Sequence, residues 1–395
     1  MQPLFVNAYT AVSAVGAGRA DTCDALREMR PGLAPNDFAH APSGGFIGRV
    51  AGLEAVRLPA DLAEYDCRNH RLAWLALGQD GFADAVAAAR TRHGAARVAT
   101  IVGTSTSGIL ETELAYRARD PATGALPATV RYATAHNFAA LAGFVRQACA
   151  LRGPMLAIST ACSSSAKVFA TAARWLAAGL CDAAVVAGVD SLCGTTLHGF
   201  GALQLVSSAP CRPFDAARDG LSLGEAAGLA LLERTPGRAH RVALVGYGES
   251  VDAYHMSAPH PEGRGAALAM AAALGRCGRR GSDIDCVQAH GTATRNNDAV
   301  EARAIARVIG ADVPVTSIKG HLGHTLGAAG ILGAVAAALS IEHGFVPGTA
   351  NTTSVDPACG RAVQLATRER PVAAVLVNAL GFGGNNASLV FARMP

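Results

Sequence analysis

Charged residues are scarce in this chain, and its basic residues form no run. Only 16% of the 395 residues are charged, half are apolar, and the formal net charge is +4. A chain of this length and composition can bury a large core, which argues against intrinsic disorder. Since no cluster of Lys and Arg is present, we expect no nucleic acid partner.

Signals for export and for disulfides are also missing. Residues 1–6 lack the charged residues and the long apolar run of a signal peptide. The ten cysteines are scattered without a CxxC pair, so we expect reduced thiols in a cytoplasmic protein. The uncharged stretch 325–341 approaches membrane-spanning length but is rich in Gly and Ala. It predicts a buried core helix and no membrane span.

Short β-branched runs alternate with alanine-rich stretches along the chain. This alternation predicts an α/β architecture with buried sheets. A polar stretch with Pro and Gly, residues 233–240, predicts the main break. The expected strands are 98–102, 183–187, 242–245 and 375–377, and the expected helices are 72–89, 166–178, 266–274, 299–309 and 328–340.

One cysteine stands out because of its position between two such elements. Cys162, in the motif STACSSS (159–165), follows the apolar run 155–158 and precedes the helix expected at 166–178. The positive end of a helix favours thiolate over thiol, and thiolate is the nucleophilic form. Cys162 is therefore a candidate nucleophile, with a buried packing role as the alternative.

Two histidine motifs lie in the C-terminal part of the chain. The motif QAHGTAT (288–294) contains His290, and the motif SIKGHLGH (317–324) contains His321 and His324. Both follow short apolar runs, 286–289 and 313–318, and side chains at strand ends converge on a crevice in α/β sheets. A lone histidine is more often structural, but two at strand ends indicate a site. Of the closely spaced pair, His321 is the expected structural residue.

These motifs, in this order along nearly the whole chain, resemble the β-ketoacyl-acyl carrier protein synthases. The resemblance also includes RPFD (212–215), RDG (218–220), GEAAG (224–228) and GFGGNN (381–386). It implies the thiolase fold, in which two similar α/β halves form a layered αβαβα core. Residues 1–240 would carry the nucleophile, with 111–135 among the loops for the acyl pocket and the dimer contacts. Residues 241–395 would carry both histidines.

The same resemblance implies a decarboxylative Claisen condensation that gives 3-oxoacyl-acyl carrier protein. Cys162 would take the acyl group from the phosphopantetheine arm of acyl carrier protein, and no further cofactor or metal would be needed. His290 and His324 would donate Nε2–H to the enolate formed from malonyl thioester. Backbone N–H groups of Cys162 and Phe382 would hold the second oxyanion. The enzyme would be a homodimer, or a heterodimer with a chain-length-factor-like subunit.

Supporting roles follow from the matched positions. Lys319 would pair with Glu301 and position the histidines, and Phe382 would gate the nucleophile. The remaining matched residues would serve the substrate arm (Thr292, Thr294, Gly381 and Gly383) and carrier protein docking (Arg68 and Arg71).

Related classes fit the residues less well. A thiolase would carry a second cysteine in the loop 380–384, an initiating synthase uses Cys-His-Asn, and a noncatalytic chain-length factor lacks the cysteine. A cysteine hydrolase would need a single general-base histidine, and zinc is excluded by the spacing of Cys162, His290 and His324. The segments 103–108, 160–165, 248–250 and 255–261 look like those of synthases from aryl polyene pigment clusters. Housekeeping fatty acid elongation is the alternative.

Overall fold

Strands from both parts of the chain form one sheet path with a repeated pattern. The structure, a computed structural model, describes residues 1–42, 44–237 and 241–395. The path runs β12-β11-β15-β16-β10-β1-β9-β7-β5-β6, with β2 paired to β1. Outward from the β1–β10 junction, each half has two antiparallel pairings followed by two parallel ones. This repetition gives two similar α/β halves, as in the thiolase fold.

The strand bounds place one half on each side of residue 240. The first half holds β1 (Leu4–Ser13), β2 (Gly16–Ala17), β5 (Val98–Gly103), β6 (Met155–Ile158), β7 (Ala183–Asp190) and β9 (Ala226–Glu233). The second holds β10 (Val242–Val251), β11 (Cys286–Gln288), β12 (Val315–Thr316), β15 (Ala374–Leu380) and β16 (Asn385–Arg393). The exact boundary after residue 240 stays a prediction, because residues 238–240 lie outside the described part of the chain.

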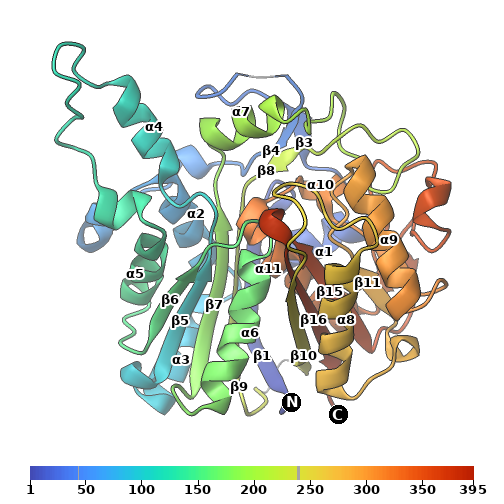
Figure 1. Cartoon of the computed structure of the whole chain (residues 1–395). Helices are drawn as coiled ribbons and strands as arrows, with labels where there is room; N and C mark the ends of the chain where they lie inside the picture. The colour runs from blue at the N-terminus through green and yellow to red at the C-terminus, as the bar shows by residue number, and fades with distance from the viewer. Residues whose placement is uncertain (43, 238–240) are drawn as a thin grey trace.

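Helices form a middle layer and two outer layers around these strands (Figure 1). In the middle, α6 (Ser164–Ala177) and α11 (Ala329–His343) pack on each other and on strands of both halves. The outer layers are α2 (Arg68–Leu77), α3 (Phe82–His93) and α5 (Phe138–Ala148) on the first half, and α8 (Arg264–Cys277) and α9 (Arg295–Val308) on the second. The layered αβαβα core is thereby confirmed.

The most apolar helix of the chain lies at the centre of the molecule. The stretch Leu326–His343 is long and apolar enough to cross a membrane, but most of it is buried within the protein. Its alanine-rich surface packs against α6 and strands of both halves. The prediction of a buried core helix is confirmed.

Two sequence predictions of secondary structure are wrong in detail. The helix expected at 72–89 is broken into α2 and α3, because Asp80 and Gly81 have φ angles of 55° and 67° that no α-helix contains. The apolar run 313–318, whose end was expected to be a strand end, is a strand over β12 alone, since Ile318 already has helical angles before α10 (Lys319–Leu322).

The remaining elements lie around the edges of the layers. The segment expected as a loop at 111–135 overlaps α4 (Ile109–Arg117) and a π-helical turn, Tyr132–His136, and extends from the body of the molecule in Figure 1. The others are α1 (Arg19–Arg27), α7 (Gly194–Ala202), the small sheet β3 (Leu33–Pro35), β4 (Phe46–Gly48) and β8 (Leu223–Gly224), and the pair β13 (Phe345–Val346) and β14 (Arg368–Glu369).

Candidate active site

Cys162 lies in the tight turn between β6 and α6, where the sequence places it. Ala161, directly before it, has a φ of 52°, an uncommon angle for a residue with a side chain. The Ser164 hydroxyl donates to the Ala161 carbonyl at 2.6 Å and fixes the turn. Cys162 is 4% exposed. The turn therefore holds the thiol at the N-terminal end of α6.

Burial, however, opposes the expected thiolate. It raises the pKa of Cys162 to about 11, while the charge of Lys319 and a backbone N–H of Phe382 act to lower it. A thiolate here loses its hydration, and that loss outweighs the favourable neighbours. The expectation of a net lowered pKa is wrong, and the resting group is a thiol.

The two predicted histidines meet Cys162 in space. The Cys162 Sγ and one ring nitrogen each of His290 and His324 all lie within 4.8 Å of one another. The two imidazole rings are 5.2 Å apart between centroids and nearly perpendicular, at 84°. His290 follows β11 and His324 follows α10, so separate strand and helix ends build one buried Cys-His-His triad.

Hydrogen bonds assign the same tautomer to both histidines. The Leu326 backbone N–H donates to Nδ1 of His324 at 3.1 Å, and the Lys319 ammonium lies 3.2 Å from Nδ1 of His290. Since Nδ1 accepts in each ring, the neutral imidazole carries its proton on Nε2. Burial and the Lys319 charge hold both pKa values well below the usual range. Each ring is thus a neutral Nε2–H donor at physiological pH.

Lys319 and Glu301 both fix His290, but they do not form the expected ion pair. Within the described residues, no carboxylate forms an ion pair with the Lys319 ammonium, which donates instead to the His290 carbonyl. Burial lowers the pKa of Lys319, and the charge of Glu301 acts against that shift without direct contact. Glu301 accepts the N–H groups of His290 and Gly291 at 2.7 and 2.8 Å. Asn378 donates to the same carboxylate at 3.1 Å. The two charged groups lie apart because Glu301 binds the N–H of His290 whereas Lys319 binds its carbonyl oxygen.

A cleft of about 350 Å³ opens onto the triad. Thr292 and Thr294 line it, and their hydroxyl oxygens lie 2.9 Å apart. Gly381 and Phe382 line it as well, whereas Gly383 is exposed and donates its N–H to the Met256 carbonyl at 2.7 Å. Four of these five predicted positions therefore face the cleft, and Gly383 shapes the loop with its φ of 75° instead.

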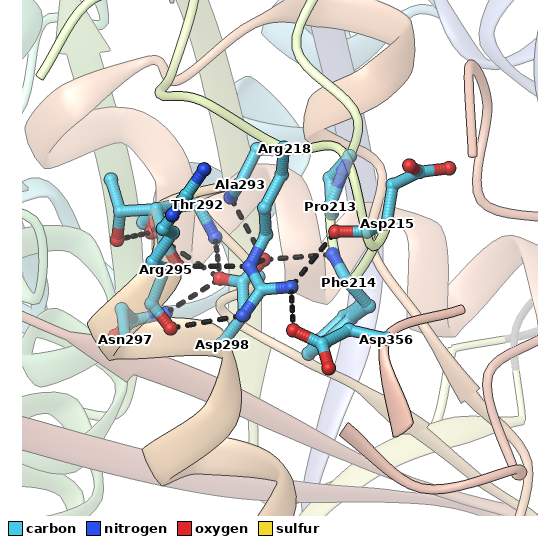
Figure 2. Close-up of polar contacts among 12 residues, drawn as sticks. Pro213, Phe214, Asp215, Arg218, Thr292, Ala293, Arg295, Asn297, Asp298 and Asp356 are labelled. Atoms are coloured by element: carbon cyan, nitrogen blue, oxygen red, sulfur yellow. Dashed lines mark hydrogen bonds and ion pairs between the residues drawn. The ribbon is translucent and has the colours of Figure 1, made fainter. Parts of the chain in front are cut away.

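Two buried carboxylates that were not predicted from the sequence hold loop backbone near the triad, and one of them, Asp298, holds Thr292 of the cleft lining. Asp298 accepts the N–H groups of Phe214 and Thr292 at 2.8 and 2.9 Å, as Figure 2 shows. Asp190 accepts the N–H groups of Ser105 and Thr106 at 2.8 and 2.9 Å. The signal available in the sequence for Asp298 was its place in the first turn after QAHGTAT. Asp190 gives no sequence signal, because its partners come from distant loops.

Arg68 is misplaced as a docking residue. It is 8% exposed, and its guanidinium forms a bidentate pair with the fully buried Glu225 at 2.8 and 2.6 Å. Arg71 pairs with Asp66 at 2.6 Å and is only partly exposed. A cation that is already desolvated and paired has no free charge for an acidic partner. The docking prediction is wrong for Arg68 and unsupported for Arg71.

Arg68→Ala is expected to destabilise the fold by about 3 kcal/mol, because Glu225 would remain buried without its partner. Chemical denaturation measures this loss. Arg71→Ala is the matched control, with an expected change of under about 1 kcal/mol for a partly exposed pair. Unchanged stability of the Arg68 variant together with weaker carrier protein binding would restore the docking role.

Convergence of the triad also bears on metal binding. The spacing in the sequence does not exclude a metal, since three donor atoms from distant segments lie within 4.8 Å of one another. The Lys319 ammonium beside His290 repels a second cation. The predicted absence of a metal therefore rests on charge rather than on spacing, and it stays a prediction.

Comparison with known proteins gives consistent matches. Residues 67–237 match the family model for the beta-ketoacyl synthase N-terminal domain, and 242–353 match that for the C-terminal domain. The chain is 32% identical to 3-oxoacyl-[acyl-carrier-protein] synthase 2 of Vibrio harveyi, covering 97% of this chain and 96% of that one. A match to the synthase 2 of Rhizobium meliloti is 38% identical and covers 62% of each chain.

The solved structures that resemble this chain include two ketosynthases. The ketosynthase ApeO in complex with its chain length factor ApeC, from Xenorhabdus doucetiae, is 33% identical with a TM-score of 0.90. That match covers 100% of this chain and 98% of the other. The ishigamide ketosynthase/chain length factor is 27% identical with a TM-score of 0.89 over the full length of both.

Proposed function

This chain belongs to the β-ketoacyl synthase family, and on that premise we propose that Cys162, His290 and His324 perform its condensation chemistry. The enzyme is a 3-oxoacyl-[acyl-carrier-protein] synthase of fatty acid or polyketide synthesis. This proposal rests mainly on one observation: the two neutral Nε2–H donors of His290 and His324 lie in the same cleft as the buried Cys162 thiol.

Acyl transfer is the first half-reaction. The Cys162 sulfur attacks the acyl thioester of the phosphopantetheine arm, a new C–S bond forms, and the arm leaves as a thiol that takes the cysteine's proton. The oxygen of the tetrahedral intermediate becomes negative, and the backbone N–H groups of Cys162 and Phe382 are the donors for it. The Phe382 N–H already acts on the sulfur in the resting site.

Decarboxylation and condensation form the second half-reaction. Malonyl thioester loses carbon dioxide, and the electron pair moves into an enolate whose oxygen accepts Nε2–H bonds from His290 and His324. Each such donor contributes about 3 kcal/mol to the transition state. The enolate carbon then attacks the acyl group on Cys162, so that a C–C bond forms, the C–S bond breaks, and the departing thiolate takes up one proton from solvent. No cofactor beyond the carrier's arm is needed.

Phe382 is proposed to set the order of the two half-reactions. Its ring packs 5.5 Å from that of Phe200, both rings line the cleft, and the flanking glycines give the loop room to move. Phe382→Ala should leave acyl transfer to Cys162 intact while raising the rate at which malonyl thioester loses carbon dioxide before acylation, a reaction that the wild-type loop slows but does not abolish. Quench-flow measurement of carbon dioxide release against acylation checks this. If acylation and carbon dioxide release keep their wild-type order and rates in the variant, Phe382 does not act as a gate.

The proposed substrate class is an unsaturated aryl chain of the aryl polyene type, extended by malonyl units. Support comes from the segments 103–108, 160–165, 248–250 and 255–261 and from the likeness, over the whole chain, to a ketosynthase solved with a chain length factor. Saturated fatty acid elongation is the alternative, favoured by the likeness to synthase 2 enzymes. A panel of cinnamoyl-type and saturated medium-chain primers on carrier protein distinguishes them. Efficient use of saturated primers alone would contradict the aryl proposal.

We also propose a dimer, with an identical chain or a chain-length-factor-like subunit, that receives acyl carrier protein. Strand β6 lies at the edge of the sheet path and exposes Met155 and Leu156, at 42% and 39%. An apolar exposed edge is suited to pairing with another chain. Native mass spectrometry after co-expression tests the pairing.

We propose a cytoplasmic location as well. All ten cysteines are free, which supports this location.

A further inference from the structure

The mouth of the active-site cleft carries one basic side chain. Cys162 and the two histidines lie at the inner end of the lining, while Arg295 is an exposed lining residue at the start of α9. Among the described residues that line the cleft, Arg295 is the sole Lys or Arg. A cation in this position meets any substrate arm that enters.

The Arg295 guanidinium is not committed to a neighbour. Within the described chain it makes no hydrogen bond or ion pair to another residue, although its charge contributes to the lowered pKa of Asp356. Asp356 itself pairs with Arg218 at 2.6 Å. By contrast, Arg303 on the same helix donates to the Pro261 carbonyl at 2.8 Å. The charge of Arg295 is therefore available to a ligand.

Arg218 fixes the backbone that carries Arg295, as Figure 2 shows. Its buried guanidinium donates to the Arg295 carbonyl at 3.0 Å and to the Thr294 carbonyl at 3.3 Å. Asp298 holds the neighbouring Thr292 N–H at 2.9 Å. The position of Arg295 at the mouth is thus set by a buried polar network and not by its own side chain contacts.

Carboxylates at the mouth are already satisfied. Asp219 accepts the hydroxyl groups of Ser207 and Ser208, and Asp252 accepts the backbone N–H of Gly265 at 2.8 Å. Both carboxylates line the cleft but face N–H or O–H donors of the protein. Of the charged side chains at the mouth, these carboxylates already have donors, whereas Arg295 has no acceptor among the described residues, which suits an anionic ligand group.

We propose that Arg295 binds the phosphate of the phosphopantetheine arm while the thioester end of that arm reaches Cys162. This inference rests on the proposed function, because it takes the arm as the molecule that enters the cleft. A guanidinium matches a phosphate with two parallel N–H bonds, and it would select substrates that carry the phosphate over those that lack it.

Two small substrates test the proposal without the carrier protein. Acyl-phosphopantetheine and acyl-pantetheine differ by the phosphate alone, and the rate of acyl transfer to Cys162 is measured for each. The wild-type enzyme is expected to favour the phosphorylated substrate about tenfold in kcat/KM, through KM. Arg295→Gln should reduce that preference to about twofold or less, whereas the control Arg303→Gln should retain it.

Three outcomes overturn the inference: no phosphate preference in the wild type, an undiminished preference in Arg295→Gln, or a defect of that variant seen solely with carrier protein. The last outcome would assign Arg295 to acidic residues of the carrier. Failure of the proposed function is distinguishable, because the wild-type enzyme would then transfer neither acyl group to Cys162.

Discussion

Cys162→Ala abolishes condensation and leaves malonyl decarboxylation measurable. Without the sulfur there is no acyl-enzyme, so condensation falls on the order of 10⁴-fold or more. The two imidazole donors remain in place, because Leu326 and Lys319 hold them independently of Cys162. Carbon dioxide release from malonyl carrier protein and 3-oxoacyl product formation are the two readouts.

Cys149→Ala is the matched control for this substitution. Cys149 is half-buried at the C-terminal end of α5 and does not line the cleft. Both activities should persist in that variant. Condensation by the Cys162 variant at a substantial fraction of the wild-type rate would remove the cysteine from the chemistry.

His290→Ala and His324→Ala have the opposite pattern. Each removes one donor to the enolate oxygen, so decarboxylation should fall by about 10²- to 10³-fold. Acyl transfer to Cys162 should survive, since it depends on backbone N–H groups. Radiolabelled malonyl carrier protein measures the first step, and intact mass of the acylated enzyme measures the second.

The pH dependence sharpens this prediction. Both histidine pKa values are lowered by burial and by Lys319, so the rings stay neutral well below their ordinary range. Decarboxylation should therefore show no loss from histidine protonation between about pH 6 and pH 8.

The matched control for His290→Ala and His324→Ala is His198→Ala, because His198 is an exposed residue of α7 outside the cleft. Either catalytic variant decarboxylating at the wild-type rate would refute the enolate role.

Much of the fold could be predicted from local pattern alone. The apolar run 183–187 is a strand because it is buried on both faces, and the alanine-rich stretch 166–178 forms most of α6, between the two halves of the sheet. The missed break at Asp80 and Gly81 had a signal in the sequence, because the polar and glycine residues at 78–81 interrupt the apolar pattern of 72–89 and an Asp-Gly pair marks a turn. The apolar pattern thus predicts well which segments are buried, but it does not by itself predict where a helix ends in a turn.

The site was predictable where a motif carries the chemistry and not where it depends on distant contacts. The triad was found because Cys162, His290 and His324 each sit in a distinctive motif at the end of an element. The pairing of Arg68 with Glu225 joins residues 157 positions apart, and no local feature marks Arg68 as buried. Likewise, the raised pKa of Cys162 comes from burial by segments that the motif does not contain.

The most direct test is to measure the intact mass of the wild-type enzyme after incubation with carrier protein that bears an acyl group, and then to map the modified peptide. We predict a mass increase of one acyl group, located on the peptide that contains Cys162, and its discharge when malonyl carrier protein is added. An acyl group on a different residue, or condensation that proceeds with Cys162 never acylated, would contradict the account.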